Sequence, residues 1–317
     1  MKHHVVCLGN AVIDMSFGGM QFPILANEHQ MFDSRLITPG GMANTAICAA
    51  RLGLEVTSLG NIGDDNLADL WRAPLLAEGI AVGDMMVLPN QPTTLSMVLS
   101  EQSGDHVFVG HRGDMLLSAD KFPDRWKSLI QVADALCIDG WNYLSIGPDV
   151  NMIAIEIAKN ADIPIFYDPG PWISQIPASW RNIMLAECTV ILLTQDEAEI
   201  AVGQSLPPEQ LAQRIRQLGA ELVVLKQGAK GMLGHTETEN ALQPGLKVPV
   251  RDLTGAGDSV LAAVMFSYLE KHDLPKMIAI ANATGAASVQ KFGAGVNGPH
   301  KAEVLAELSK IDGRYYF

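Results

Sequence analysis

The sequence predicts an α/β fold, with a doubly wound, mostly parallel sheet flanked by helices and a small antiparallel β lid. First, several short runs rich in Val, Ile and Leu lack polar alternation, which is typical of strands covered on both faces. Second, helix-like stretches separate these runs at regular intervals, as βαβ units require. Third, two segments interrupt this alternation with strands that have no helix between them. We expect one domain over residues 1–317, because no linker is long enough to separate two.

The predicted elements follow from these patterns in chain order. The expected parallel strands are 5–9, 55–60, 135–139, 163–168, 189–194 and 221–226. The expected helices are 43–53, 66–78, 149–160, 207–219 and 275–290. Residues 14–38 and 93–113 are the two interrupting segments, the second with a turn at Ser103-Gly104, and we expect them to form the lid.

Composition limits the classes of function. The 317 residues carry a formal net charge of −13, which argues against a nucleic-acid or anionic-membrane partner. No apolar run approaches the roughly 18 residues of a membrane span, and the first residues do not form a secretory signal. The four cysteines lie far apart in apolar segments, so we interpret them as buried hydrophobic residues. We therefore expect a soluble, cytoplasmic protein.

Several common catalytic and nucleotide motifs are missing or lack their context. There is no G-x-x-x-x-G-K-[ST], no H-x-x-x-H pair and no G-x-S-x-G. A G-x-G-x-x-G occurs at 293–298, but it follows a helix-like stretch and precedes Pro299. This context does not fit a dinucleotide fingerprint, so an NAD-dependent enzyme has little support.

The stretch RDLTGAGDSVLAAVMFSYL at 251–269 is the main candidate for chemistry. After Asp258 the apolar residues have helical spacing, which places Gly255-Ala256-Gly257 at a helix N-terminus. Unpaired N–H groups there can hold an anion, and Asp258 beside them could take a proton from an attacking hydroxyl. An ordinary helix cap with a flexible approach explains the same pattern, and the triplet alone leaves both interpretations open.

The stretch from Asp252 to Asp258 resembles the C-terminal signature of the PfkB carbohydrate kinase family, which has a ribokinase-like fold. The order of the other motifs resembles that family over nearly the whole chain. The resemblance implies that Asp258 is the catalytic base and that the N–H groups of Gly255, Ala256 and Gly257 stabilise the transferred phosphoryl group. In some family members the residue at the position of Asp252 helps to hold a monovalent cation such as K⁺.

The same resemblance implies an acceptor site near the N-terminus. Asp14, Gly40, Gly41 and Asn44 match the substrate-binding positions, with two residues rather than the usual three between Gly-Gly and Asn. Arg112 is a candidate substrate contact from the lid, or else a solvated edge-strand charge.

On the nucleotide side, the resemblance implies ATP and Mg²⁺, with Glu197 holding Mg²⁺ through water. Each such residue also has a structural interpretation, for example Glu197 as a helix cap and Gly228 with Gly231 as the ends of a hairpin. Asp168 lies at the carboxyl end of a predicted strand, where it could line this region or simply precede the turn at Pro169. The expected ATP-binding residues are Thr194, Glu197, Lys226, Gly228, Gly231, Thr254 and Asn282.

Together these expectations describe an ATP-dependent phosphotransferase that acts on a hydroxyl of a small sugar or sugar-like metabolite. A nucleoside kinase on the same fold and a non-catalytic sugar or nucleotide sensor are the alternatives. The expected partners are the small-molecule sugar and ATP, with no nucleic acid and no membrane. The apolar stretch TTLSMVL at 93–99 further predicts a homodimer through the lid.

Overall fold

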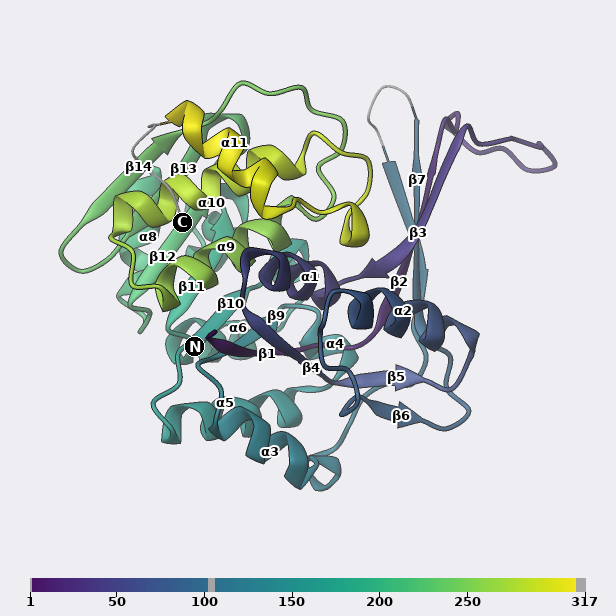
Figure 1. The fold of residues 1–317 in the computed structure, drawn as a ribbon, viewed down its shortest axis with the longest axis horizontal. Helices are drawn as coiled ribbons and strands as arrows, with labels where there is room; N and C mark the ends of the chain where they lie inside the picture. The colour runs from purple at the N-terminus through teal and green to yellow at the C-terminus, as the bar shows by residue number, and fades with distance from the viewer. Residues whose placement is uncertain (1, 102–105, 312–317) are drawn as a thin grey trace.

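A computed structural model describes residues 2–101 and 106–311. Its main body is an eight-stranded sheet of order β14-β13-β12-β11-β10-β9-β1-β4 (Figure 1). The strands from β4 to β12 in that order run parallel, and β13 pairs antiparallel with both β12 and β14, which confirms the predicted mostly parallel sheet. The strands are β1 (His4–Leu8), β4 (Glu55–Leu59), β9 (Ala135–Asp139), β10 (Ile165–Asp168), β11 (Val190–Thr194), β12 (Leu222–Lys226), β13 (Gly231–His235) and β14 (Asn240–Pro244).

Helices cover both faces of this sheet because the central strands bury side chains on both. In β12, Val224 faces one hydrophobic cluster, and its neighbours Val223 and Leu225 face the other. The first face packs against α1 (Met42–Leu52), α2 (Asn66–Ala77), α9 (Ala256–Leu269), α10 (Leu274–Ser288) and α11 (Lys301–Ile311). The second face packs against α3 (Asp124–Gln131), α5 (Pro148–Asn160), α6 (Ala178–Glu187), α7 (Gln195–Val202) and α8 (Pro208–Arg216).

Short elements complete the main body. A two-stranded parallel sheet pairs β5 with β6 beside β4. The one-turn helix α4 follows β9. These elements are β5 (Asn61–Gly63), β6 (Met86–Leu88), α4 (Asn142–Ser145) and the 3₁₀ turns Ala119–Lys121, Gly170–Ser174, Gly228–Lys230 and Gly295–Asn297.

A second sheet, of strand order β3-β2-β7-β8, projects from the body, and its strands come from the two segments expected to form the lid, so it is called the lid below. The prediction that it would be purely antiparallel is wrong, because β2 and β7 pair in parallel. Between them the chain passes through α1, β4 and α2 and so re-enters the lid in the same direction. The predicted turn at Ser103-Gly104 lies outside the described residues. The lid strands are β2 (Val12–Gly18), β3 (Ser34–Gly40), β7 (Thr94–Ser100) and β8 (His106–His111).

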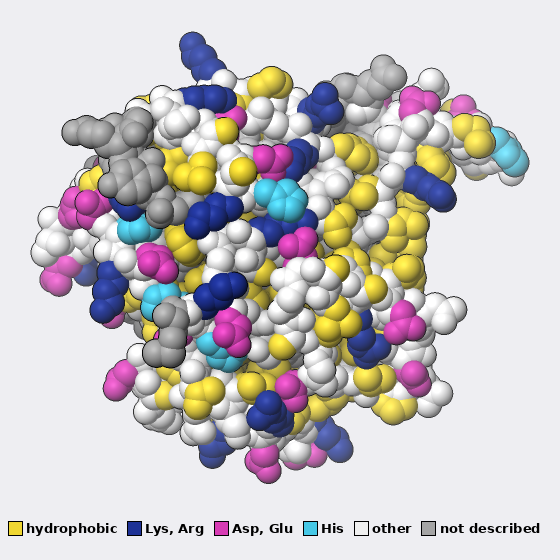
Figure 2. Space-filling view, in the orientation of Figure 1, with side chains coloured by type: hydrophobic (Ala, Val, Ile, Leu, Met, Phe, Trp, Pro, Cys, Tyr) yellow, Lys and Arg dark blue, Asp and Glu magenta, His cyan; other side chains and the backbone are white. Residues whose placement is uncertain are grey.

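The lid carries apolar side chains that the main body does not cover. Figure 2 shows hydrophobic side chains gathered on the side of the molecule from which the lid projects. Ile37 of β3 and Phe108 of β8 are 43% and 61% exposed.

Within the described residues, no helix is both long and apolar enough to cross a membrane.

Candidate active site

The parallel strands deliver polar side chains to one edge of the sheet. Asp139, Asp168, Thr194 and Lys226 are the last residues of β9, β10, β11 and β12, which lie next to one another. Side chains at the carboxyl ends of parallel strands therefore meet at this edge, where open α/β sheets bind ligands.

The catalytic helix predicted from the sequence begins at the same edge. A Cβ placed on Gly257 of α9 would lie 3.4 Å from Lys226 Nζ and 3.8 Å from Asp168 Oδ2. The ends of β10 and β12 thus lie beside the first turn of α9.

Three N–H groups at the start of α9 have no acceptor in the described residues. Gly255 caps the helix in the left-handed conformation (φ 73°), where a Cβ would lie 2.5 Å from the Cβ of Ala294. The Ala256 N–H is engaged, since it donates to Leu253 O at 3.2 Å. Over residues 2–101 and 106–311, no acceptor reaches the N–H groups of Gly255, Gly257 and Asp258. These donors and the positive end of the helix dipole suit an anion.

Asp258 is joined to the predicted acceptor-binding residue Asn44. Asn44 Nδ2, from the first turn of α1, donates to Asp258 Oδ2 at 2.9 Å. Desolvation raises the pKa of Asp258 to about 6, although the hydrogen bond from Asn44 opposes the shift. The Oδ1 atom of Asn44 is buried and has no donor in the described chain. This acceptor atom is therefore available to a hydroxyl group of a ligand.

Asp14 lies close to the Gly-Gly turn, as the resemblance implies. Asp14 and Gly40 lie on the neighbouring strands β2 and β3, and any Cβ on Gly40 would overlap the Asp14 carboxylate. Gly41 then caps α1 at a φ of 58°, a conformation that glycine adopts without strain. Desolvation and the charge of Asp258 raise the pKa of Asp14 to about 7. The structure thus brings Asp14, Asn44 and Asp258 together.

Asp139 was not among the sequence-predicted site residues. Desolvation, followed by the charge of Asp258, raises its pKa to about 7, and its Oδ1 accepts the Asn142 N–H at 3.1 Å. The rule that singled out Asp168, an acidic residue at the carboxyl end of a strand, would also have found Asp139.

Thr194 and Glu197 bind each other at the start of α7. The Glu197 N–H donates to Thr194 Oγ1 at 3.2 Å, and the Thr194 N–H donates to Glu197 Oε2 at 2.6 Å. This capping box holds the Glu197 side chain in place, and desolvation raises the pKa of its carboxyl. Its Oε1 atom accepts no hydrogen bond from any described residue.

Lys226 forms an ion pair with Asp168 inside the site. The two side chains are only 12% and 10% exposed. Desolvation lowers the pKa of Lys226, but the charges of Asp168 and Glu197 outweigh it, so the net shift is upward. The ammonium group therefore keeps its charge at neutral pH.

The remaining predicted nucleotide residues lie around the end of the sheet that contains β13 and β14. Gly228, at a φ of 56°, follows β12, and Gly231 is the first residue of β13. Asn282 in α10 donates from Nδ2 to Pro244 O at 2.9 Å, which ties α10 to the end of β14. No hydrogen bond of the described residues connects these three with Asp258.

Asp252 organises the turn that precedes α9. Its Oδ1 accepts from the Thr254 N–H at 2.9 Å and from Thr254 Oγ1 at 2.7 Å. Its Oδ2 accepts from the Gly293 N–H at 2.8 Å. Asp252 therefore joins the Gly-Ala-Gly turn to the loop at 293–298.

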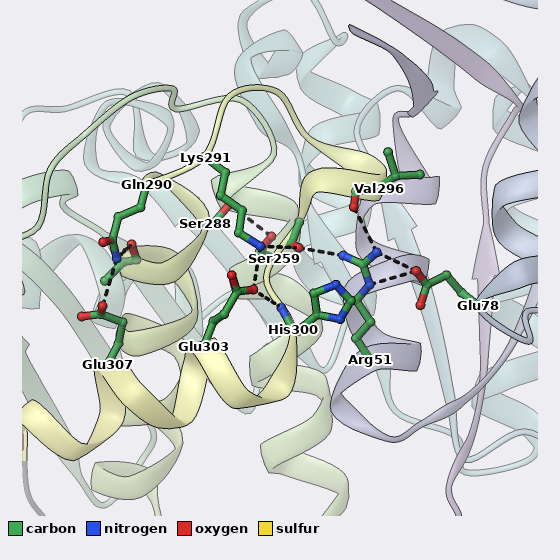
Figure 3. A network of polar contacts seen from close by, with 12 residues as sticks. Arg51, Glu78, Ser259, Ser288, Gln290, Lys291, Val296, His300, Glu303 and Glu307 are labelled. Atoms are coloured by element: carbon green, nitrogen blue, oxygen red, sulfur yellow. Dashed lines mark hydrogen bonds and ion pairs between the residues drawn. The ribbon is translucent and has the colours of Figure 1, made fainter.

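Arg51, at the end of α1, donates hydrogen bonds to the loop at 293–298 (Figure 3). Its guanidinium donates to Gly298 O at 2.6 Å and to Val296 O at 3.0 Å. It also pairs with Glu78 at 2.6 Å, and the Arg51 side chain is only 6% exposed. On the other side of the loop, the Val296 N–H donates to Thr38 Oγ1 of β3 at 3.1 Å. The loop thus links the base of the lid to α1.

Arg112 is hydrogen-bonded to the short helix that follows β9. It is exposed and donates from Nη1 to Leu144 O, in the segment that follows β9. No hydrogen bond of the described chain joins its guanidinium to Asp14, Asn44 or Asp258.

Comparisons with known proteins agree with this arrangement. Residues 2–301 match the pfkB family carbohydrate kinase. A fructokinase-1 from Zea mays is 26% identical over 295 residues, which covers 87% of this chain and 90% of that protein.

Two solved structures share the fold at lower identity. Arabidopsis thaliana ribokinase complexed with ribose and ATP superposes with a TM-score of 0.83 at 23% identity, covering 97% of this chain and 99% of that one. An Escherichia coli protein assigned as a ribokinase II, in complex with ATP and Mg²⁺, gives 0.85 at 20% identity with the same coverage. From the match to nearly the whole chain, together with the strand-end cluster and the open start of α9, we conclude that the chain belongs to the PfkB family of carbohydrate kinases.

Proposed function

We propose that this carbohydrate kinase transfers the γ-phosphoryl group of ATP to a hydroxyl of a small sugar or sugar-like metabolite. The observation that carries the proposal is the 2.9 Å hydrogen bond from Asn44 Nδ2 to Asp258 Oδ2. It supports the proposal because it joins the candidate base, which follows the open N–H groups of α9, to a residue whose own amide oxygen has no partner in the described chain. A hydroxyl bound there would meet a base and an anion site together.

The residues of this chain divide the chemistry among them. Asp14 and Asn44 bind the acceptor through its hydroxyls, and Asp258 accepts the proton of the reacting hydroxyl. The N–H groups of Gly257 and Asp258 stabilise negative charge on the group in transfer, which is the main form of help in phosphoryl transfer. The lid covers the acceptor and excludes water, which would otherwise compete as acceptor. ATP, when bound, supplies the phosphoryl group.

Two cations fit this proposal. Within the described residues, no group of three or more His, Cys, Asp or Glu side chains could hold a metal ion. Mg²⁺ binds ATP phosphates and water with only one or two carboxylates, a role that Glu197 and its unpartnered Oε1 fit. We further propose that a monovalent cation such as K⁺ binds near Asp252, whose carboxylate already orders the turn at Thr254, and replacing K⁺ by tetramethylammonium in an activity assay tests it.

An ADP-release assay over neutral sugars, sugar acids and nucleosides tests the proposed function. We expect turnover with a polyhydroxylated sugar that depends on Asp258. A preference for nucleosides would favour a nucleoside kinase instead. Calorimetric binding of ATP and a sugar without formation of ADP would favour a sensor.

We also propose that the lid pairs two copies of the chain. Val107, Phe108 and Val109 on the edge strand β8 are 43%, 61% and 45% exposed, an unusual series for a surface strand. Sedimentation at micromolar concentration should give a dimer. Phe108→Lys should shift it to the monomer, and a monomeric wild type would contradict the proposal.

A further inference from the structure

A buried lysine lies at the positive end of α9. Helix N-termini favour negative charge, so a cation placed there is unfavourable by itself. Lys226 nevertheless points its ammonium group at the first turn, 3.4 Å from the position that a Gly257 Cβ would occupy. The ammonium group of Lys226 and the N-terminus of α9 therefore both create positive potential beside Gly257.

The ion pair with Asp168 explains how a buried Lys226 keeps its charge, but it does not explain why the ammonium group lies at the start of α9. Its Oδ2 pairs with Lys226 Nζ, and its Oδ1 accepts the Gly170 N–H at 3.0 Å. A buried ion pair contributes little net stability, because the cost of desolvating both charges offsets their attraction. A purely structural pair would gain nothing from facing the open N–H groups of α9.

The space beside Gly257 is polar. A Cβ on Gly257 would be in ordinary van der Waals contact with Lys226 Nζ and Asp168 Oδ2, at 3.4 and 3.8 Å, so both charged groups lie directly beside the first turn of α9. The N–H groups of Gly257 and Asp258, which have no acceptor in the described chain, belong to the same first turn. An anion held by backbone donors at this turn would also meet the ammonium group.

We propose that Lys226 contacts the transferred phosphoryl group as a catalytic residue and that Asp168 is the positioning residue that aims it. The proposal rests on the kinase function proposed above and assigns the source of positive charge in it. During transfer the bond from the acceptor oxygen to phosphorus forms and the bond from phosphorus to the β-phosphate oxygen breaks. The acceptor proton goes to Asp258, and ADP carries away the electron pair. Lys226 changes no bond and stabilises negative charge throughout.

Nucleotide binding tests this without reference to any acceptor. Calorimetry with Mg²⁺ compares AMP-PNP, which has a γ-phosphoryl group, with ADP, which lacks it. Lys226→Met should weaken AMP-PNP binding about tenfold or more and ADP binding much less. In turnover assays the same variant should lower kcat about 10²–10³-fold, as the loss of one preorganised electrostatic contact does, and Lys226→Arg should restore part of it.

Two further variants keep the test decisive. Lys230→Met removes an exposed lysine from the same turn and should leave both affinities and kcat unchanged. If Lys226→Met fails to fold because Asp168 is left unpaired, the double variant Lys226→Met/Asp168→Asn removes both charges and should show the same loss of preference for AMP-PNP. Asp168→Asn alone should lower kcat less than Lys226→Met, and Asp168→Glu should restore part of that loss.

An AMP-PNP to ADP affinity ratio in Lys226→Met within twofold of the wild type would overturn the assignment. A wild-type protein that binds neither nucleotide would instead refute the proposed kinase function. The two failures are therefore distinguishable in one set of titrations.

Discussion

Asn44 and Asp258, which are 214 positions apart in the sequence, share a hydrogen bond of 2.9 Å between Nδ2 and Oδ2. The bond joins the first turn of α1 to the first turn of α9, and both helices pack on the same face of the sheet. It therefore ties the acceptor half of the site to the half that begins the catalytic helix.

Replacing the base tests the role of Asp258 directly. Asp258→Asn should fold normally, because the amide keeps an oxygen that accepts from Asn44, while kcat falls about 10²–10⁴-fold. Steady-state kinetics and a thermal melt measure the two effects. Asp69→Asn on the surface of α2 is the matched control, and near-wild-type turnover in Asp258→Asn would exclude it as the base.

The pH dependence of turnover should follow the raised pKa of Asp258. A base acts when deprotonated, so kcat/KM should rise with pH and reach half its plateau near pH 6, the pKa of Asp258. Asn44→Ala removes a hydrogen bond that lowers this pKa, so its acidic limb should move to higher pH. Profiles between about pH 5 and 9 measure both, and a limb that does not move would mean that another group controls it.

Stability should respond to pH through Asp139. Its pKa is 3.8 as a free side chain and about 7 in the fold, so between these values the folded state binds the proton more tightly. Protonation of Asp139 therefore stabilises the folded state at low pH, and the free energy of unfolding falls as pH rises from 3.8 to about 7. Asp139→Asn, which keeps the acceptor for the Asn142 N–H, should raise the free energy of unfolding by about 2 kcal/mol at neutral to alkaline pH, allowing for partial solvent screening.

Urea unfolding at several pH values measures this difference. The gain from Asp139→Asn should vanish in acid, where the carboxyl is protonated in both states. A gain that is the same at every pH would mean that ionisation of Asp139 does not cause it.

Glu197 should control the requirement for Mg²⁺. Glu197→Gln keeps a side-chain oxygen for the Thr194 N–H, so α7 should stay capped and the melting temperature should change little. Loss of the carboxylate charge should raise the Mg²⁺ concentration for half-maximal activity by about tenfold. Magnesium titrations measure this, with Glu199→Gln, two residues further along the same helix, as the control.

Arg51 should contribute more to stability than a surface arginine does. Arg51→Met removes the donor to Glu78 and to Val296 O and leaves Gly298 O with only the 3.4 Å bond from Lys291, so we expect a loss of about 3 kcal/mol in the free energy of unfolding. Arg72→Met breaks an exposed pair of 3.6 Å on α2 and should cost about 0.5 kcal/mol or less.

Hydrogen exchange separates the role of Arg51 from general destabilisation. Faster exchange in Arg51→Met should concentrate in the loop at 293–298 and at the end of α1. Equal losses in the two arginine variants would show that the buried contacts add nothing.

The sequence predicted the parallel strands well because each is a short apolar run whose neighbours cover both faces. It did not predict β13 and β14, whose glycines at 231 and 234 and mixed burial weaken the strand pattern. The direction of β7 against β2 was also missed, since pairing between distant segments depends on the path of the chain rather than on local periodicity.

The site followed the same division. The residues around Asp258 could be predicted because they lie in recognisable local motifs, and the structure places Asp14, Asn44 and Asp258 together. The sequence did not predict the ion pair of Lys226 and Asp168 or the raised pKa of Asp139. Both depend on which strands are neighbours in the sheet, and the local sequence of one segment does not determine that. Whether Arg112 contacts an acceptor stays a prediction.

The parallel pairing of β2 with β7 also limits how such a lid can change. A lid built from one hairpin could be gained, lost or exchanged as a single insertion. Here the two halves are separated by α1, β4 and α2, and each half supplies a central strand to the other. Removing either half would expose the edge of a strand that is now central, β2 or β7. A lid taken from a relative must therefore replace both segments, the one with β2 and β3 and the one with β7 and β8, at the same time.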